Sequence, residues 1–380
     1  MCDLYAVFHF AFNLVHHTAF RVQWNSIRTS PANDRPASYV LKFNLKSVSY
    51  YDWDSYENMM NIGFWVPDPD SHAAPERCFR WTAEVLADRE EVNFLVGSPD
   101  GCDWNVPSTD VATPRRLADI HDADVIHWNK MMDNTVPKCV PAKRVLTYHG
   151  DVQWSEPRLN YGDHPYLTSL KERLVETLKL WQYDAVCFVS NDLHERMTER
   201  LSPLLSRTVT THNGVPPYIE PTKPAREDPY VFHVSQRGPR KNPDGLLEGF
   251  RRANIDMPLY IAGSGWEVED ANANVTTLGY VDDEELSAWY SGAAAFLFPS
   301  LHECFGLPAV EALECGTTPV ISDRYALPEL AGKQGVLCNP DDPDDIARAI
   351  ERAVEREPQS GTAFSWERTA DQLITTYESL

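Results

Sequence analysis

The sequence predicts an α/β protein with two doubly wound, parallel-sheet domains that face each other across a cleft. The chain has 380 residues, 43% of them hydrophobic, which is too long for one small core and enough for two. Short apolar segments of strand length alternate with helical segments along most of it. A Pro-rich, charged stretch without periodicity, residues 217–229, divides this alternation into two series and is expected to be a linker.

The first series forms the expected N-terminal domain, residues 60–216. It opens with an apolar strand from residue 60, a Pro/Asp loop and a helix. Five residues of that helix share one face, at i, i+3, i+4, i+7 and i+8: Cys78, Trp81, Thr82, Val85 and Leu86. Further strands are expected at 92–97, 124–128, 144–150, 185–190 and 208–215, with helices notably at 166–182 and 191–202.

The second series forms the expected C-terminal domain, residues 230–363, followed by a last helix at 364–380. Strands are expected at 230–235, 258–265, 275–281, 293–300, 318–322 and 335–338, and helices at 244–254 and 282–293. Ligands of such folds bind at the carboxyl ends of the parallel strands, which places the site in the cleft.

Residues 1–59 show no clear period and are rich in aromatic residues and Asn. They are either an ordered N-terminal extension of the protein or sequence translated from DNA upstream of the real start. We favour a start at Met59 or Met60, which an intact mass of the natively expressed protein would decide.

The charge balance is strongly acidic, with 56 Asp and Glu against 34 Lys and Arg, a net charge of −22. This argues against a nucleic-acid binder, which needs a basic face, and opposes docking onto anionic lipid. A solvated acidic surface suits a salt-rich cytoplasm, because a Debye length of about 3 Å at 1 M salt hides self-repulsion. The sequence therefore suggests an origin in a halophilic archaeon.

The eight cysteines form no C-x-x-C pair, and several lie in apolar runs, so we expect scattered buried thiols. No segment reaches the roughly 18 consecutive apolar residues that a membrane span requires. We see no secretion signal in the N-terminal sequence. We expect a cytoplasmic protein.

The stretch "SLHECFGLPAVEALECGTTPV", residues 300–320, follows an apolar run that reads as a buried strand. Gly306 permits an unusual backbone angle, Pro308 suits the first turn of a helix, and Gly316 suits the position past its end. The backbone N–H groups around 304–308 would then form an anion site at a helix N-terminus. Glu303 would lie on the loop rim and Glu311 about one turn into the helix.

Two carboxylates beside a phosphate site would repel the phosphate, so they are better placed to accept hydrogen bonds from sugar hydroxyls. The stretch therefore indicates a nucleotide-sugar site. The alternative is an ordinary helix with acids near its N-terminus, which the helix dipole favours in any case.

"ECFGLPAVEAL" resembles the Glu-x-Phe-Gly…Glu signature of retaining GT-B glycosyltransferases, the family-four group also called glycosyl transferases group 1. The segments "DVIHW", "YHGD", "AVCFVSNDL", "HNGVP", "SQRGPRKNPDGLLEGF", "YIAGSG", "LGYVDDEEL" and "FSWERTADQL" follow in the family's usual order. The resemblance covers most of residues 60–380 and implies two Rossmann-like domains, with the C-terminal helix packing back toward the N-terminal domain.

The resemblance also implies residue roles. Glu303 would contact the transferred sugar and Glu311 the ribose hydroxyls, while the backbone of Cys304, Phe305, Gly306 and Leu307 would receive the diphosphate and sugar. Lys241 matches the Lys of the family's phosphate clamp; for its Arg, Arg237 and Arg240 are both open. The backbone near Gly279 and Tyr280 would frame the base, and His149 would orient the sugar.

One loop departs from the family pattern of Gly-Gly-x-x-Arg. Here "AAPER" puts Ala73 and Ala74 in place of the glycines and keeps Arg77, so each Ala brings a Cβ toward the ligand. Either the loop is set back or the donor or acceptor geometry differs.

The activity that the resemblance implies is transfer of a hexose, with retention of configuration, from a UDP- or GDP-sugar. The acceptor would be a glycan, a lipid-linked or a small-molecule hydroxyl, and the enzyme would act in the cytoplasm or at the cytoplasmic face of the membrane. Neither a metal nor a cofactor is expected, and "NPDDPDDIARAI" reads as helix capping. The alternatives are a sugar-nucleotide epimerase, a phosphorylase, or a non-catalytic GT-B partner that binds sugar or a catalytic subunit.

Overall fold

The computed structural model describes residues 60–65, 74–90, 92–97, 123–129, 142–159, 165–201, 205, 207–267, 274–357, 359 and 361–380. Residues 1–59 lie outside this part of the chain, so both explanations of their origin remain predictions. Ala73, the first of the two alanines in the expected N-domain loop, also lies outside the described residues.

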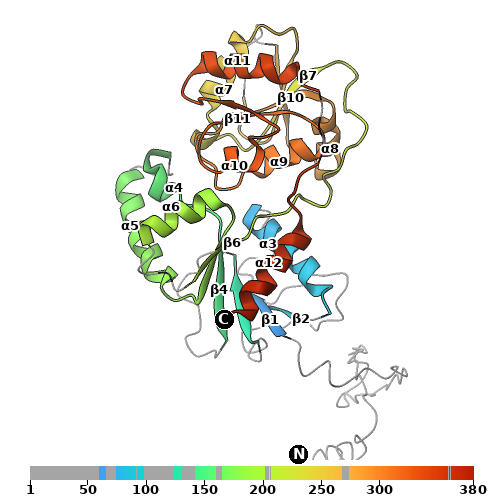
Figure 1. Cartoon of the computed structure of the whole chain (residues 1–380). Coiled ribbons are helices and arrows are strands. Elements are labelled where there is room, and N and C mark those ends of the chain that lie inside the picture. The colour runs from blue at the N-terminus through green and yellow to red at the C-terminus, as the bar shows by residue number, and fades with distance from the viewer. Residues whose placement is uncertain are drawn as a thin grey trace, which may run out of the picture. The chain divides into compact units, whose positions relative to one another are not determined.

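The first six strands form one parallel sheet in the order β2-β1-β3-β4-β5-β6 (Figure 1). Their bounds are β1 Met60–Trp65, β2 Val92–Gly97, β3 Val125–Trp128, β4 Lys143–Tyr148, β5 Ala185–Phe188 and β6 Thr208–Thr210. Strands β3 and β5 are buried along their whole length, as expected of a parallel sheet covered on both faces. The apolar runs of the sequence are therefore the centre of this sheet.

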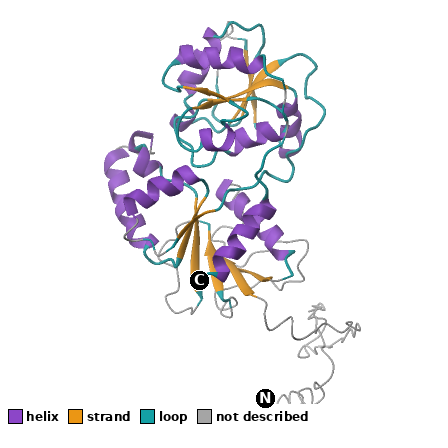
Figure 2. Ribbon diagram, in the orientation of Figure 1, coloured by secondary structure: helices purple, strands orange, loops and turns teal. Residues whose placement is uncertain are grey.

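Helices lie along both faces of these strands (Figure 2). Their bounds are α3 Ala74–Ala87, α4 Val152–Ser155, η2 Pro157–Leu159, α5 Pro165–Leu180, α6 Asn191–Leu201 and α12 Trp366–Glu378. Helices α5 and α6 share one hydrophobic cluster with the sheet, and α3 and α12 share the cluster on the other face. The last helix of the chain thus packs against the first sheet, as the family resemblance implied.

The remaining six strands form a second parallel sheet in the order β12-β11-β10-β7-β8-β9. Their bounds are β7 Tyr230–Val234, β8 Leu259–Ala262, β9 Val275–Gly279, β10 Ala293–Phe298, β11 Pro319–Ser322 and β12 Val336–Cys338. The helices are η4 Pro239–Lys241, α7 Pro243–Arg252, α8 Asp283–Ser291, α9 Leu307–Glu314, α10 Leu327–Ala331 and α11 Pro343–Val354. One face of this sheet shares a hydrophobic cluster with helices α8, α9 and α10. The other face shares a second hydrophobic cluster with α7 and α11.

The expected fold class is confirmed: two parallel, Rossmann-like sheets, each covered by helices on both faces. The expected strands are present, but most end earlier than the sequence suggested. The clearest case is β6, which ends at Thr210 and not at residue 215, the end expected from the sequence. Residues beyond Thr210 run into an irregular connection whose Thr211 and Asn213 are buried.

Two other expectations concern cysteines and membranes. The five cysteines in the described residues, Cys78, Cys187, Cys304, Cys315 and Cys338, are buried free thiols, as expected. Among the described residues, no helix has both the length and the apolar character that crossing a bilayer requires.

Candidate functional site

The loop between β10 and α9 has the backbone that its sequence requires. Gly306 has a φ of 97°, in the left-handed region that glycine tolerates, and a Cβ there would lie 2.6 Å from the Leu327 side chain. Pro308 occupies the first turn of α9, and Gly316, with φ of 85°, follows its C-cap Cys315. Gly306 and Pro308 therefore fix the end of the loop from which α9 begins, and Gly316 follows the end of the helix.

Glu303, in the middle of this loop, is paired with Lys241. The Nζ of Lys241 donates to Oε1 of Glu303 over 2.5 Å. Lys241 ends the 3-10 helix η4 after β7, the neighbour of β10 in the sheet. Glu303 is only 9% exposed, so it is buried and does not lie on the rim of the loop, the position expected from the sequence.

The electrostatics of this pair keep the carboxylate charged. Burial alone would raise the pKa of Glu303, but the positive charges of Lys241 and Arg240 outweigh burial and lower it. Arg240 also anchors the loop through its backbone, because its carbonyl accepts from Leu301 N over 2.8 Å. Lys241, Arg240 and Glu303 therefore form a cluster in which two positive charges act on one carboxylate.

Arg237, the other candidate for the clamp, lies differently. Its guanidinium lies 6.0 Å from the centre of the Trp266 ring, and its backbone N donates to the Ser264 carbonyl over 2.9 Å. Of the two arginines that the sequence left open, Arg240 is the one whose charge acts on Glu303.

Glu311, in α9, is buried at 6% exposure. Its Oε2 accepts from the hydroxyl of Tyr290 over 2.7 Å. Burial raises the pKa of Glu311 to about 7, although the Tyr290 hydrogen bond and the charge of Arg77 act in the opposite direction. Glu311 is therefore a carboxyl group that changes protonation near neutral pH.

Arg77, from α3, reaches the second sheet's helix α8. One guanidinium nitrogen donates to Asp283 Oδ2 over 2.6 Å and to the Tyr218 hydroxyl over 2.7 Å. The guanidinium carbon lies 5.1 Å from the ring centre of Trp81 and 5.2 Å from that of Tyr218. Arg77 is thus held by aromatic rings and by a carboxylate from the other sheet.

The loop expected at Ala73 and Ala74 ends earlier than the sequence suggested. Ala74 is the first residue of α3, so it is a helix residue and not a loop residue. A helical Ala needs no positive φ, which explains why glycine is not required there.

His149 follows the carboxyl end of β4. Its Nε2 is buried and has no hydrogen-bond partner within the described residues. Burial lowers the pKa of His149 to about 4, so the ring is neutral at pH 7. A neutral ring with a buried, unpartnered nitrogen can accept from or donate to a ligand hydroxyl.

The remaining candidates differ in exposure. Gly279 has φ of 71° with open space beside it, and Tyr280 is 78% exposed. Cys304 and Phe305 are buried, and Leu307 packs against the same cluster, which also contains residues of β5 and α6. The side chains of Cys304, Phe305 and Leu307 therefore pack toward the first sheet, whereas Glu303 pairs with Lys241.

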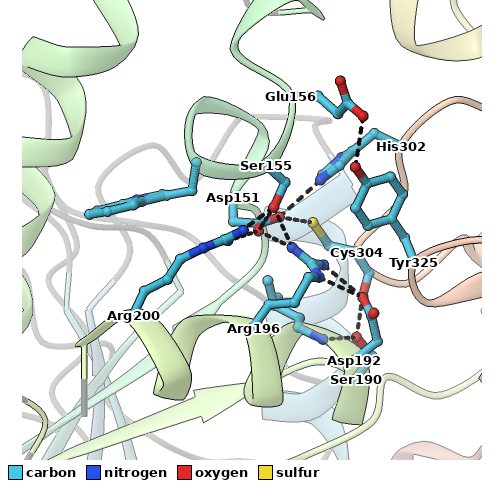
Figure 3. A network of polar contacts seen from close by, with 12 residues as sticks. Asp151, Ser155, Glu156, Ser190, Asp192, Arg196, Arg200, His302, Cys304 and Tyr325 are labelled. Atoms are coloured by element: carbon cyan, nitrogen blue, oxygen red, sulfur yellow. Dashed lines mark hydrogen bonds and ion pairs between the residues drawn. The ribbon is translucent and has the colours of Figure 1, made fainter.

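Sequence reasoning missed the most connected residue of the site, Asp151 (Figure 3). Its Oδ1 accepts from His302 Nε2 over 2.9 Å and from Cys304 Sγ over 3.3 Å. Its Oδ2 accepts from Ser155, Arg196 and Arg200. The only sequence signal was its place in "YHGD", two residues after His149.

Asp151 is completely buried, yet it is ionised. Burial would raise its pKa, but the hydrogen bonds from His302 and Ser155 and the charge of Arg196 lower it far below the usual range. Asp151, His302 and Cys304 offer ligand atoms within 4.8 Å of one another, which is close enough for a metal ion. The donor set fits a dication poorly, because Arg196 and Arg200 already bring positive charge to Asp151 and the pKa of the Cys304 thiol is raised well above its usual value by burial and by Asp151.

The two Rossmann-like sheets define the GT-B class, and solved glycosyltransferases share this fold. Sucrose-phosphate synthase from Thermosynechococcus elongatus aligns with a TM-score of 0.61 and 20% identity, over 84% of this chain and 98% of its own. HepE from Anabaena, solved in complex with UDP and glucose, aligns with a TM-score of 0.60 and 17% identity, over 84% of this chain and all of its own.

Residues 217–368 match the family model "Glycosyl transferases group 1". O-antigen chain mannosyltransferase B of Escherichia coli is 34% identical over 175 residues, 40% of this chain and 46% of that protein. A GDP-mannose-dependent alpha-(1-6)-phosphatidylinositol dimannoside mannosyltransferase of Mycobacterium tuberculosis is 30% identical over 163 residues, 38% of this chain and 43% of that protein. The family model covers residues 217–368 alone, and the chain spans less than half of the length of each of these two relatives.

Proposed function

We propose that the protein transfers a hexose from a nucleotide-diphosphate sugar to an acceptor hydroxyl with retention of configuration. The observation that carries this proposal is the arrangement of Glu303, Lys241 and Glu311 around the start of α9, inside the segment that matches the glycosyltransferase family. An ionised acid, a lysine and a helix N-terminus suit a sugar, a leaving diphosphate and the backbone contact to it.

The donor that we propose is GDP-mannose. Both curated relatives reported above are named mannosyltransferases, and one of the two is named GDP-mannose-dependent. A UDP-sugar is the alternative, since HepE was solved in complex with UDP and glucose.

The catalytic work falls to positioning and charge. Lys241 and Arg240 would stabilise the negative charge that grows on the leaving diphosphate, and Glu303 would hold a sugar hydroxyl. Glu311 would accept from the ribose hydroxyls and His149 would orient the sugar. The leaving diphosphate would help to deprotonate the acceptor, without a protein nucleophile, a metal or a cofactor.

The first experiment is thermal stabilisation of the full chain in molar KCl by GDP, UDP, ADP and their common sugar conjugates. We expect the largest shift with GDP or GDP-mannose, because bound ligand stabilises the folded state by mass action. Transfer of labelled mannose to an acceptor mixture would follow. No shift with any nucleotide would favour a non-catalytic GT-B partner, and hydrolysis or inversion without an acceptor would favour an epimerase.

A lipid-linked acceptor is the second part of the proposal. In the described part of the chain, five of the seven exposed large hydrophobic residues lie on α5 or just after it: Leu170, Leu174, Val175, Leu178 and Trp181. Such a stripe supports peripheral contact with a lipid surface. Sedimentation with neutral phosphatidylcholine vesicles should fall on changing Leu174→Glu and Leu178→Glu together; equal sedimentation of the variant would contradict it.

We also propose halophilic adaptation, for which the net charge of −22 is the support. Screening of acidic self-repulsion should raise the melting temperature as KCl rises toward molar concentration. A protein that unfolds in molar KCl and is stable without it would contradict this.

A further inference from the structure

Asp151 holds the two neighbours of Glu303 at once. The loop order is His302, Glu303, Cys304, and the side chains on either side of Glu303 donate to the same carboxylate oxygen of Asp151. The partners are 151 and 153 residues apart in the chain, and they join the loop after β4 in the first sheet to the loop after β10 in the second. One buried acid therefore restrains the backbone on both sides of the candidate sugar contact.

Glu303 itself has a different partner from its two neighbours. It pairs with Lys241, which follows β7 of the second sheet, while His302 and Cys304 both bond to Asp151, which follows β4 of the first sheet. A second contact fixes the same backbone, because Ser190 Oγ donates to the Cys304 carbonyl over 2.7 Å. With its neighbours held by the first sheet, Glu303 is left to face Lys241.

Asp151 is itself a rigid anchor. Ser155 and Arg200 donate to its Oδ2 over 2.5 and 3.3 Å, and Arg196 bonds to the same oxygen. Arg196 is in turn oriented by Asp192, one turn earlier in α6, over 2.7 Å. Figure 3 shows these side chains converging on Asp151 from the first sheet's helices, with His302 and Cys304 from the other side.

We propose that Asp151 is a positioning residue: it fixes the loop 302–304 so that Glu303 meets the sugar in the productive orientation. This inference rests on the proposed function. It assigns Asp151 an effect on the rate of transfer, through His302 and Cys304, in addition to its contribution to stability. A misplacement of about 1 Å in a catalytic group can cost roughly 100-fold in rate, so restraint of this loop is worth much to turnover.

The substitution Asp151→Asn tests this with little change in size. The amide has only one acceptor oxygen, which can face either His302 or the arginines. Its NH2 group then points at the remaining donors and cannot accept a hydrogen bond from them. We expect kcat to fall roughly 10- to 100-fold while the donor KM changes less than about 3-fold, the pattern of a lost transition-state orientation. Glu248→Gln is the control, because it removes a carboxylate from the exposed ion pair with Arg252 on α7 and touches none of the groups around Asp151; its kcat should stay within about two-fold.

A second pair of variants avoids the anchor itself. His302→Gln keeps an N–H donor near the position of Nε2, whereas His302→Leu removes it. We expect Gln to retain most of the turnover per folded molecule and Leu to lose it. Equal turnover of the two, or unchanged kcat in folded Asp151→Asn, would overturn the proposal.

Hydrogen exchange separates this inference from the proposed function. In Asp151→Asn the amides of residues 301–306 should exchange faster than in the parent chain, and in Glu248→Gln they should not. Unchanged exchange would overturn the inference even for an active enzyme. If no donor supports transfer in the parent chain, the proposed function fails, and faster exchange in Asp151→Asn alone would still show that Asp151 fixes the loop.

Discussion

The ammonium group of Lys241 lies 2.5 Å from the carboxylate of Glu303, and the two residues come from the loops that follow neighbouring strands, β7 and β10. Each neutralises the other in the structure described here. A bound sugar diphosphate would offer both a new partner: phosphate oxygens for Lys241 and hydroxyl groups for Glu303. The pair thus satisfies the buried charge of Glu303 and the partly buried charge of Lys241.

The first prediction concerns Glu303. Glu303→Ala should reduce transfer by about 100-fold or more, because a group placed for the transition state is lost, while nucleotide affinity stays largely intact. Glu248→Ala, an exposed acid on α7 that pairs with Arg252, is the control and should be fully active. Steady-state transfer and nucleotide titration provide the measurement; retained transfer would remove Glu303 from the site.

The second prediction concerns the pH dependence that Glu311 imposes. Its pKa in the folded chain is raised to about 7 from 4.5, so between these values the folded state holds a proton that the unfolded state has lost. Stability therefore falls as pH rises from 4.5 to 7 and then levels off. Glu311→Gln removes this slope. Urea unfolding at pH 5 and pH 8 should show that the free energy of unfolding of the variant, relative to that of the parent chain, is roughly 1–3 kcal/mol higher at pH 8 than at pH 5. Parallel pH curves for the two proteins would contradict the shifted pKa.

The third prediction concerns the contact between Arg77 and Asp283. If Arg77 binds donor phosphate, it must leave Asp283, so Asp283→Asn should tighten nucleotide-diphosphate binding by roughly 3- to 10-fold by removing a competing charge. Arg77→Leu should weaken binding instead. Calorimetric titration of both variants at fixed salt is the measurement. An unchanged affinity in Arg77→Leu would leave this arginine a purely structural link to α8.

The fourth prediction concerns the core of the first sheet. The hydroxyl of Tyr377, in α12, lies 2.5 Å from Nδ1 of the buried His127, whose Nε2 pairs with Thr147 over 2.8 Å. Tyr377→Phe leaves a buried nitrogen without a partner and should cost about 1–3 kcal/mol of unfolding free energy. Tyr280→Phe, at a residue that is 78% exposed, is the matched control and should be close to neutral in the same urea titration. Equal midpoints for both variants would show that this hydrogen bond contributes nothing.

Much of the fold could be predicted because burial on both faces leaves a local signature. A strand such as β10, Ala293–Phe298, is a continuous apolar run, and α3 places Cys78, Thr82 and Leu86 on one buried face. The turn chemistry of Gly306, Pro308 and Gly316 is local as well, which is why the start and end of α9 were predicted correctly.

The site could be predicted only in part, because several of its contacts join residues that are distant in the sequence. The bonds of Asp151 to His302 and of Arg77 to Asp283 span 151 and 206 residues, and no periodicity encodes such a meeting. The depth of Glu303 and the hydrogen bond of Glu311 to Tyr290 depend likewise on packing around the loop. Residue type and spacing selected the two acids, whereas their surroundings needed the structure.

Helix α12 has a consequence for how the chain acquires its structure. The ribosome delivers the strands of the first sheet early, yet Leu373 and Tyr377 complete the hydrophobic cluster that covers one face of these strands. During synthesis that face, with Phe64, Val125 and Val145, is covered by α3 but not by α12 while the whole second sheet is made. The domain that is translated first is therefore finished last, and a nascent chain stalled before residue 366 would carry an exposed apolar surface for chaperones to shield.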